Sequence, residues 1–213
     1  MHKIIFIQFI FLSFIFADYT QVKITKDIAY VDVNESGQNI RIHRINDTAN
    51  VLSDDFTKTS RVCPPFCVQP IRPVKGVHNL EELELIDFIK NKVVKHKGLL
   101  IDARTPKWFK AETIPMAINV PFIITQTDDK KIINKLFTLF GAKVKPDGTI
   151  DYTNAKDLAL FCNGIWCGQS PTFIRNITRH GYPANKLYYY RSGMQGWKLL
   201  GLTTVINGDE EVK

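Results

Sequence analysis

The alternation of apolar and polar residues changes character at Gly76. From Asp18 to about Val51 apolar residues alternate with polar ones as they do in extended strands, and the stretch NESGQ is typical of a turn between two strands. After Gly76, short apolar runs alternate with segments of helical periodicity. This second pattern predicts an α/β fold, a mainly parallel sheet with helices on both faces, over residues 76–208. The first predicts a small N-terminal β-unit within residues 18–60.

The α/β part contains several apolar segments of strand or helix length. Asn79 is expected to cap the first helix, with Glu82 reaching back to it, and Ile132 is expected to face inward on a later helix. The apolar runs predict strands or buried extended segments at 99–103, 118–124, 158–161 and 187–190. The helical patterns predict helices at about 80–94, 128–140, 170–181 and 194–200.

A cysteine lies where one of the buried strands ends. In DLALFCNGIWCGQSP the strand runs out at Cys162, and a loop of seven residues leads to Ser170, a good N-cap residue, and Pro171 at the first helical position. Gly181 is expected to end this helix. Ligands of open α/β sheets bind at the carboxyl ends of the strands, so Cys162 is predicted to lie in a binding or active site.

The surroundings of Cys162 favour a thiolate. The N–H groups of a loop that contains Gly164 and Gly168 can turn toward the sulfur, and the helix N-terminus adds the positive end of its dipole. Cys162 is therefore a candidate nucleophile, and the same N–H groups could hold a small anion. The alternative is a small buried residue that only ends a strand. Cys167 is either a resolving thiol for Cys162 or an ordinary loop residue.

A second pair of cysteines lies in a proline-rich segment, residues 61–75, which contains CPPFCVQPIRP. Four prolines exclude regular structure, so this segment is interpreted as a linker. Cys63 and Cys67 are expected to form a local disulfide that pins the linker, although the CPPFC loop could instead lie beside the active site as a second sulfur acceptor. A four-cysteine zinc site fits the spacing of the two pairs poorly, and no metal is expected.

Residues 1–17 have the pattern of a secretory signal peptide. A basic residue, Lys3, precedes an apolar run of 13 residues from Ile4 to Phe16, shorter than the about 20 that a membrane-spanning helix needs. We expect this segment to be removed, which leaves no stable membrane anchor and sends the protein out of the cytoplasm, to the periplasm. Cysteines can be oxidised in that compartment.

The charge of the chain gives little indication of a polymeric partner. Lys and Arg number 28 against 21 Asp and Glu, a formal net charge of +7, but the basic residues are scattered along the sequence. A surplus of this size favours small anions and does not indicate nucleic-acid binding.

Four motifs in order resemble the rhodanese family of sulfurtransferases, and most of all its secreted single-domain members. They are GLLIDART at 98–105, IPMAINVPF at 114–122, CNGIWCGQSP at 162–171 and YYYRSGMQGWKLLGL at 188–202. The resemblance covers roughly residues 76–206. It implies that Asp102 and Arg104 orient local structure and that Cys162 accepts a sulfane sulfur as a persulfide.

The resemblance also implies a substrate class and a set of binding residues. A small sulfur-containing anion such as thiosulfate would donate the sulfur, and a thiol or cyanide would accept it, with no cofactor. The substrate would be held by Asn163, Gly164, Ile165, Trp166, Cys167, Gly168, Gln169 and Ser170, with Arg191 approaching from the neighbouring strand or serving only structure. Gln169 stands where the family commonly has Arg, which leaves the donor open.

Other functions compete with sulfur transfer. Cysteine phosphatases share the fold, but residues 163–170 contain no Arg or Lys to bind phosphate oxygens. Thiol redox chemistry by Cys162 and Cys167, with a partner protein, and a sulfur-carrier or interaction module remain as alternatives. Trp108 and Phe109 either line the mouth of an apolar pocket or pack in the core, which is the more common fate.

Overall fold

The computed structural model describes residues 22–35 and 37–208. The expected signal segment, residues 1–17, lies outside them. Within the described residues, no helix has the length and apolar character needed to cross a bilayer.

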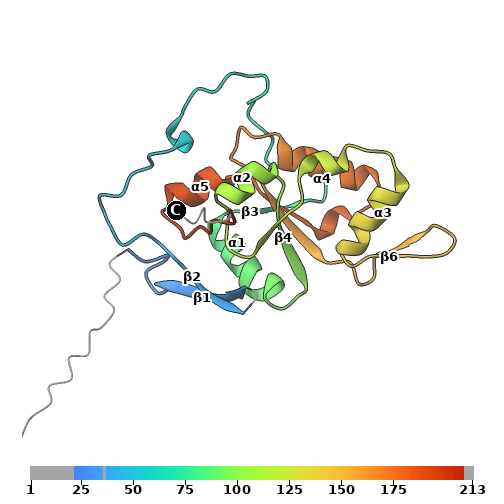
Figure 1. The fold of residues 1–213 in the computed structure, drawn as a ribbon, viewed down its shortest axis with the longest axis horizontal. Coiled ribbons are helices and arrows are strands. Elements are labelled where there is room, and N and C mark those ends of the chain that lie inside the picture. The colour runs from blue at the N-terminus through green and yellow to red at the C-terminus, as the bar shows by residue number, and fades with distance from the viewer. Residues whose placement is uncertain (1–21, 36, 209–213) are drawn as a thin grey trace, which may run out of the picture.

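The centre of the protein is a five-stranded parallel sheet with the strand order β3-β9-β8-β4-β5 (Figure 1). Because β8 is the middle strand, its carboxyl end lies at the middle of the sheet edge where ligands of such folds bind. The strands are β3 (His78–Leu80), β4 (Gly98–Asp102), β5 (Ala117–Asn119), β8 (Asp157–Phe161) and β9 (Leu187–Tyr190). β3 is a strand that the sequence pattern did not predict.

Successive side chains of the sheet enter two different hydrophobic cores. On β8, Phe161 packs in one core with Trp197, while Leu160 packs in the other with Phe137 and Phe173. Both faces of the sheet are thus buried, as the continuous apolar runs of its strands predict. The α/β fold expected from the sequence is confirmed.

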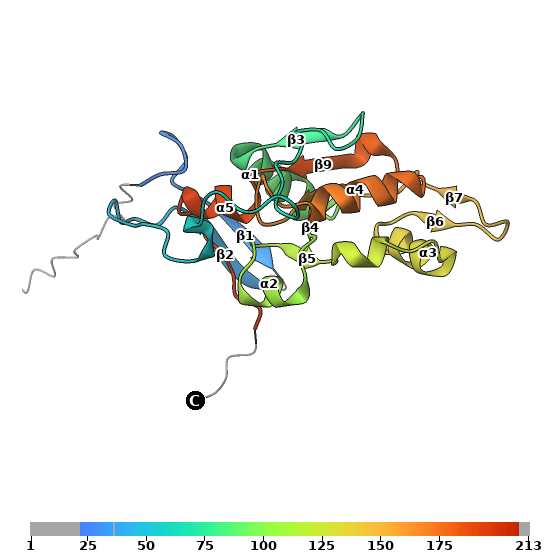
Figure 2. The same cartoon turned by 90° about the horizontal axis from the view of Figure 1, so that it is seen from above.

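Helices cover both faces, as Figures 1 and 2 show. One core includes residues of α1 and α5, and the other includes residues of α3 and α4. The helices are α1 (Glu82–Phe88), which continues as a π-helical turn at Ile89–Val93, α2 (Pro106–Ala111), α3 (Lys130–Leu139), α4 (Gln169–Arg179) and α5 (Gly193–Leu199), with short 3-10 turns at Asp55–Thr57, Phe122–Thr125 and Ala184–Lys186.

One expectation about α1 and one about α3 are wrong. Asn79 does not cap the first helix, because it lies in β3 and its side chain donates a hydrogen bond to the Ile71 carbonyl oxygen at 2.6 Å. Glu81 takes the N-cap position, and its N–H donates to the Glu84 carboxylate. Ile132 does not face inward on α3 and is 41% exposed, whereas Ile133 on the next position is buried.

The N-terminal β-unit is an antiparallel hairpin of β1 (Tyr30–Glu35) and β2 (Gln38–His43). The extended pattern before Tyr30 does not form a strand, because the Thr25 hydroxyl accepts hydrogen bonds from the N–H groups of Asp27 and Ile28 and closes a turn there. Val33 and Ile42 bury the hairpin in the same core as α1 and α5. A second, two-stranded sheet, β6 (Lys143–Val144) with β7 (Ile150–Asp151), surrounds the predicted turn at 146–148.

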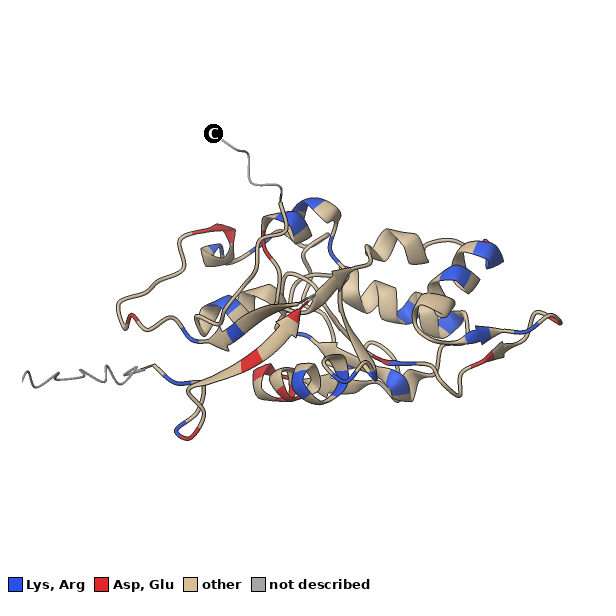
Figure 3. Cartoon of the chain, turned by 60° about the horizontal axis from the view of Figure 1, so that its bottom comes forward, with Lys and Arg blue, Asp and Glu red and all other residues tan. Residues whose placement is uncertain are grey.

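A long segment joins β2 to β3 and crosses the carboxyl edge of the sheet. In Figure 1 its teal trace passes α5 and runs over the top of the molecule before it reaches β3. It contains the 3-10 turn Asp55–Thr57 and the disulfide between Cys63 and Cys67. Lys and Arg are spread over many elements in Figure 3 and do not gather on one of them.

Candidate active site

Backbone hydrogen bonds from the start of α5 hold the loop after β8 in place. The Met194 N–H donates to the Cys162 carbonyl oxygen at 3.0 Å, and the Gln195 N–H donates to the Asn163 carbonyl oxygen at 2.9 Å. Gly193 has a φ of +57°, and a Cβ atom at this position would overlap the Cys162 carbonyl. The two segments can therefore approach this closely only because residue 193 is glycine.

Ser170 has a different role from the one that the sequence suggested. It is not the N-cap of α4, because the helix begins at Gln169 with Gly168 before it. Ser170 thus lies in the first turn of the helix, where its buried hydroxyl donates a hydrogen bond to the Cys162 sulfur at 3.0 Å. A serine that looked like a helix cap is instead a direct partner of the candidate nucleophile.

The surroundings of Cys162 favour the thiolate. Burial of the sulfur opposes ionisation, but the Cys167 thiol, the Ser170 hydroxyl and the N–H groups of Ser170 and Gly164 outweigh it and hold the pKa of Cys162 below the ordinary thiol value. The expected ring of N–H donors is therefore present in part. The N–H donors are Gly164, in the loop, and Ser170, in the first turn of α4. The Gly168 carbonyl oxygen instead accepts a hydrogen bond from the Thr172 N–H of that helix.

Cys167 lies beside Cys162 and both are free thiols. In its thiol form Cys162 also donates to the Cys167 carbonyl oxygen at 3.2 Å, and the Cys167 thiol points at the Gln169 side-chain oxygen, 3.7 Å away. Interaction with the Cys162 sulfur, followed by burial, raises the pKa of Cys167 well above its ordinary value. One thiol of the pair is thus disposed to ionise and the other to keep its proton.

A buried ion pair between Asp102 and Arg104 supports the loop that follows Cys162. The carboxylate of Asp102 at the end of β4 accepts three hydrogen bonds from the Arg104 guanidinium and one from the Thr113 hydroxyl, at 2.7–3.1 Å. Arg104 also donates to the Asn163 side-chain oxygen at 3.2 Å, which links the pair to the loop. Both charged side chains are almost fully buried. The structure is consistent with an orienting role for Asp102 and Arg104.

The CPPFC segment lies directly against this loop. The Gln69 N–H donates to the Ile165 carbonyl oxygen at 2.8 Å, and the Phe66 ring meets the Trp166 ring edge-on with 5.5 Å between centroids. Arg191, for which contact with the substrate and a structural role were both left open, donates from Nε to the Gln69 carbonyl oxygen at 2.9 Å. Its guanidinium thus holds the linker, and Arg191 is not among the residues that line the pocket.

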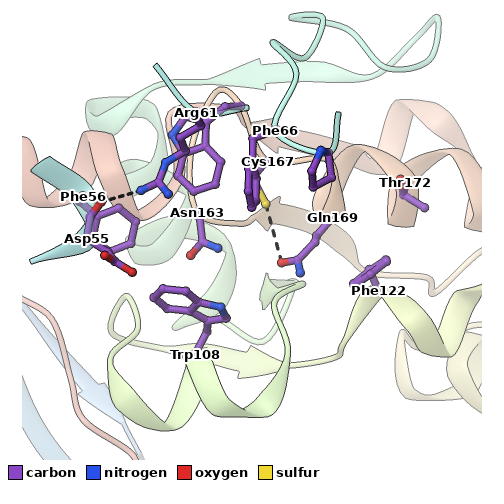
Figure 4. A pocket seen from close by; sticks show the side chains of 13 residues that line it. Asp55, Phe56, Arg61, Phe66, Trp108, Phe122, Asn163, Cys167, Gln169 and Thr172 are labelled. Atoms are coloured by element: carbon purple, nitrogen blue, oxygen red, sulfur yellow. Dashed lines mark hydrogen bonds between the residues drawn. The ribbon is translucent and has the colours of Figure 1, made fainter. Parts of the chain in front are cut away.

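A pocket of about 490 Å³ opens over the loop. Figure 4 shows Arg61 and Phe66 on one side of it and Trp108 on the other, with Cys167 and Gln169 between them. Five aromatic side chains contribute to its wall: Phe56, Phe66, Trp108, Phe122 and Trp166.

Only some of the site residues that the sequence suggested line the pocket. Its lining includes Asn163, Trp166, Cys167, Gly168 and Gln169. Gly164 and Ser170 lie beneath the pocket as partners of Cys162, and the exposed Ile165 lines a different hollow beside α5. Cys162 itself is 1% exposed, whereas Cys167 is 5% exposed and reaches the pocket wall. Of the two thiols, Cys167 is therefore the one that faces the pocket.

Sequence reasoning missed Phe56 and Arg61 in the outer wall of the pocket. They precede Cys162 by about a hundred residues, and no local pattern indicates that they return to it. The CPPFC loop, for which a place beside the active site was one of two interpretations, does lie there through Phe66, with its two cysteines joined in a disulfide. Trp108 lines the pocket and is half-buried. Of the two interpretations of this residue, a place at the mouth of a pocket therefore agrees with the structure and a place in the core does not. Sequence reasoning also missed Tyr189, which is fully buried on β9. Burial, and then the charge of Cys162, raise the pKa of Tyr189, so its phenol stays neutral beside Cys162 and Cys167.

Four thiols are not available for a common metal site, since Cys63 and Cys67 are joined in a disulfide. Within the part of the chain that the structure describes, no three His, Cys, Asp or Glu side chains are grouped so that they could hold a metal ion.

Comparison with known proteins assigns residues 83–200, more than half of the chain, to the family described as Rhodanese-like domain. No curated protein matches the chain. Among solved structures it is similar to a thiosulfate sulfurtransferase from Pseudomonas aeruginosa, with 15% identity, a TM-score of 0.40 and coverage of 62% of this chain and 20% of that one. It is also similar to the As-Sb reductase from Leishmania major, with 20% identity, a TM-score of 0.42 and coverage of 59% and 79%. A human single-domain sulfurtransferase has 17% identity, a TM-score of 0.39 and coverage of 58% and 96%.

Proposed function

Because the chain belongs to the rhodanese-like domain family, we propose that it is a sulfurtransferase that carries a sulfane sulfur as a persulfide on Cys162. The observation that supports this most directly is the hydrogen-bonding environment of the Cys162 sulfur. Burial of this sulfur opposes ionisation, but the Cys167 thiol, the Ser170 hydroxyl and two N–H groups face it and lower its pKa. Such donors stabilise a thiolate, which is the nucleophilic form of cysteine.

In the first half-reaction the Cys162 thiolate attacks the outer sulfur of a donor such as thiosulfate. A bond forms between the Cys162 sulfur and that outer sulfur, the sulfur–sulfur bond of thiosulfate breaks, and sulfite leaves with the electron pair. The product is an anionic persulfide on Cys162, and the Ser170 hydroxyl and the Gly164 N–H lie close enough to this centre to bind its charge. The proposal needs no general base, because the groups that lower the pKa of Cys162 favour its thiolate before the donor arrives.

Access to Cys162 is the step in which Cys167 takes part. Cys167 faces the pocket and Cys162 is 1% exposed, so in this proposal the Cys167 side chain moves aside to let a donor reach the nucleophile. In the second half-reaction a thiolate or cyanide attacks the outer sulfur and returns Cys162 to its thiolate form. Two half-reactions through one covalent intermediate require ping-pong kinetics.

Steady-state kinetics test this proposal. Sulfite release is measured while thiosulfate and a thiol acceptor are varied, and parallel double-reciprocal plots are expected. Cys162→Ser should abolish sulfite release. Release of sulfite at the native rate by Cys162→Ser would exclude this cysteine as the sulfur carrier.

Thiol redox chemistry is a second candidate, favoured by the contact between Cys162 and Cys167. In this proposal the pair cycles between a dithiol and a disulfide with a partner protein that exchanges electrons with it. It predicts a change of two thiols per molecule without sulfite. A sulfur-carrier module would instead hold the persulfide and turn over slowly with small acceptors alone.

We propose the periplasm as the compartment, as for the secreted single-domain members that the chain resembles. Support comes from the signal-like pattern of residues 1–17 and from the disulfide between Cys63 and Cys67, a bond that persists in oxidising compartments. Cell fractionation with cleavage mapping of the N-terminus tests this localisation.

A further inference from the structure

The wall of the pocket comes from two parts of the chain. Residues 163–172 provide the floor from within the family domain, whereas Asp55, Phe56, Arg61, Pro65 and Phe66 come from the segment before residue 83. The disulfide, the Gln69–Ile165 hydrogen bond and the Phe66–Trp166 contact hold that segment in place. The pocket is therefore a feature of the whole chain and not of the family domain alone.

The size of the pocket exceeds what a small oxyanion needs. About 490 Å³ lies within the range of about 300–1,000 Å³ that is common for pockets of organic ligands. Thiosulfate has five heavy atoms and would leave most of this space, and most of the aromatic surface, uncovered. The volume indicates a larger molecule with an apolar body.

The charge of the pocket leads to the same conclusion. Of the described residues that line it, Arg61 alone is cationic and Asp55 alone is anionic, so the wall has no net charge. The Arg61 guanidinium lies over the Trp166 ring, with its central carbon 3.9 Å from the ring centroid, and donates to the Asp55 carbonyl oxygen. A guanidinium held in this way extends the aromatic wall, and flat rings favour flat apolar partners.

We propose that this pocket binds the sulfur acceptor, and that the acceptor is an organic thiol with a flat apolar body. The inference rests on the proposed sulfurtransferase function. The body of the acceptor lies between Trp108 and Phe66, and its sulfur points to Cys167 and, behind it, to Cys162. The acceptor thiolate attacks the outer sulfur of the Cys162 persulfide; the new sulfur–sulfur bond forms on the acceptor, the old one breaks, and Cys162 leaves as a thiolate.

The pocket can be probed without any sulfur transfer. Iodoacetamide and iodoacetanilide share the same reactive group and differ by one phenyl ring. The alkylation rates of Cys167 and Cys162 are measured with each reagent by peptide mass spectrometry. For each cysteine, the rate with iodoacetanilide is divided by the rate with iodoacetamide. This ratio is then divided by the same ratio for glutathione, which gives the normalised ratio. We expect the normalised ratio for the native protein to be at least about tenfold, because the ring is buried between aromatic side chains.

Variants of the wall separate the pocket from general reactivity. Trp108→Ala and Phe66→Ala should bring the normalised ratio down toward one, whereas Phe109→Ala, on the same helix but outside the pocket, should keep it. Thermal unfolding of each variant shows whether it folds. Phe66→Leu, which keeps an apolar side chain and loses the ring, should give an intermediate ratio.

A second arm measures acceptor use. With thiosulfate as donor, 2-phenylethanethiol should have a kcat/KM at least about tenfold above that of 2-mercaptoethanol, and Trp108→Ala should remove the difference. A normalised ratio near one in the native protein, or equal use of the two thiols, would overturn the inference. Failure of thiosulfate to place any sulfur on the protein, with the alkylation preference intact, would instead reject the proposed donor chemistry and keep the pocket's ligand class.

Discussion

Replacement of Ser170 by alanine tests how the site stabilises the thiolate. The Ser170 hydroxyl donates to the Cys162 sulfur at 3.0 Å and is fully buried, so water does not replace it when it is removed. The Ser170 N–H remains in the variant, as does the start of α4. The substitution therefore deletes one donor and leaves the rest of the site in place.

The size of the effect follows from the energy of one hydrogen bond to a charged group. Such bonds contribute about 1.5–3 kcal/mol, and the weaker acceptor strength of sulfur places this one near the lower end. Since one pKa unit corresponds to about 1.4 kcal/mol, the pKa of Cys162 should rise by about one unit. The sign is fixed: the hydroxyl favours the charged form, so its loss raises the pH at which Cys162 ionises.

The assay is the pH dependence of Cys162 alkylation by iodoacetamide, followed at the level of the peptide. In the native protein the midpoint should lie below that of an ordinary thiol, and in Ser170→Ala it should move up by about one unit. Thr178→Ala is the matched control, because its hydroxyl lies on the same helix and donates to the Ile174 carbonyl oxygen instead. An unchanged midpoint in Ser170→Ala would show that the hydroxyl does not stabilise the thiolate.

Three further predictions concern the frame around the site. Asp102→Ala leaves Arg104 buried without its partner and should lower the free energy of unfolding by about 3–5 kcal/mol in urea titrations; a loss below about 1 kcal/mol would contradict the structural role of the pair. Gly193→Ala should destabilise the fold by more than about 1 kcal/mol, because its φ of +57° and the Cys162 carbonyl exclude a Cβ atom, while Gly168→Ala, with its nearest neighbour 3.7 Å away, should cost less than this in the same titration. Equal losses for the two glycine variants would show that the contact beneath Cys162 is not tight. Cys63→Ser should cost about 2 kcal/mol or less, since the closed loop is short, and should reduce the preference for iodoacetanilide by releasing Phe66; an unchanged preference would mean that the disulfide does not shape the pocket.

The sequence indicates those parts of the fold that local pattern controls. The strand that ends at Phe161 and the helix that buries Phe173, Ile174 and Ile177 have clear periodicities, and the structure confirms both. β3 was not predicted, because a segment of three residues with two polar side chains, His78 and Asn79, has no strand pattern. Its pairing with β9 makes it a strand.

The site was predictable only as far as it is local. Cys162 and its loop follow from one strand, one loop and one helix, but the exact helix start decides whether Ser170 caps the helix or faces the sulfur. The helix begins at Gln169 and not at Pro171, and this shift of two residues reversed that interpretation. Phe56, Arg61 and Phe66 reach the pocket through tertiary contacts, and such contacts leave no trace in the spacing of nearby residues.

Location of the transferred sulfur tests the central claim most directly. The native protein is treated with thiosulfate, freed of excess donor and analysed by intact mass and peptide mass without reduction. The account predicts one added sulfur atom on Cys162, absent in Cys162→Ser and retained in Cys167→Ser. A sulfur adduct that persists in Cys162→Ser, or that is found only on Cys167, would contradict it.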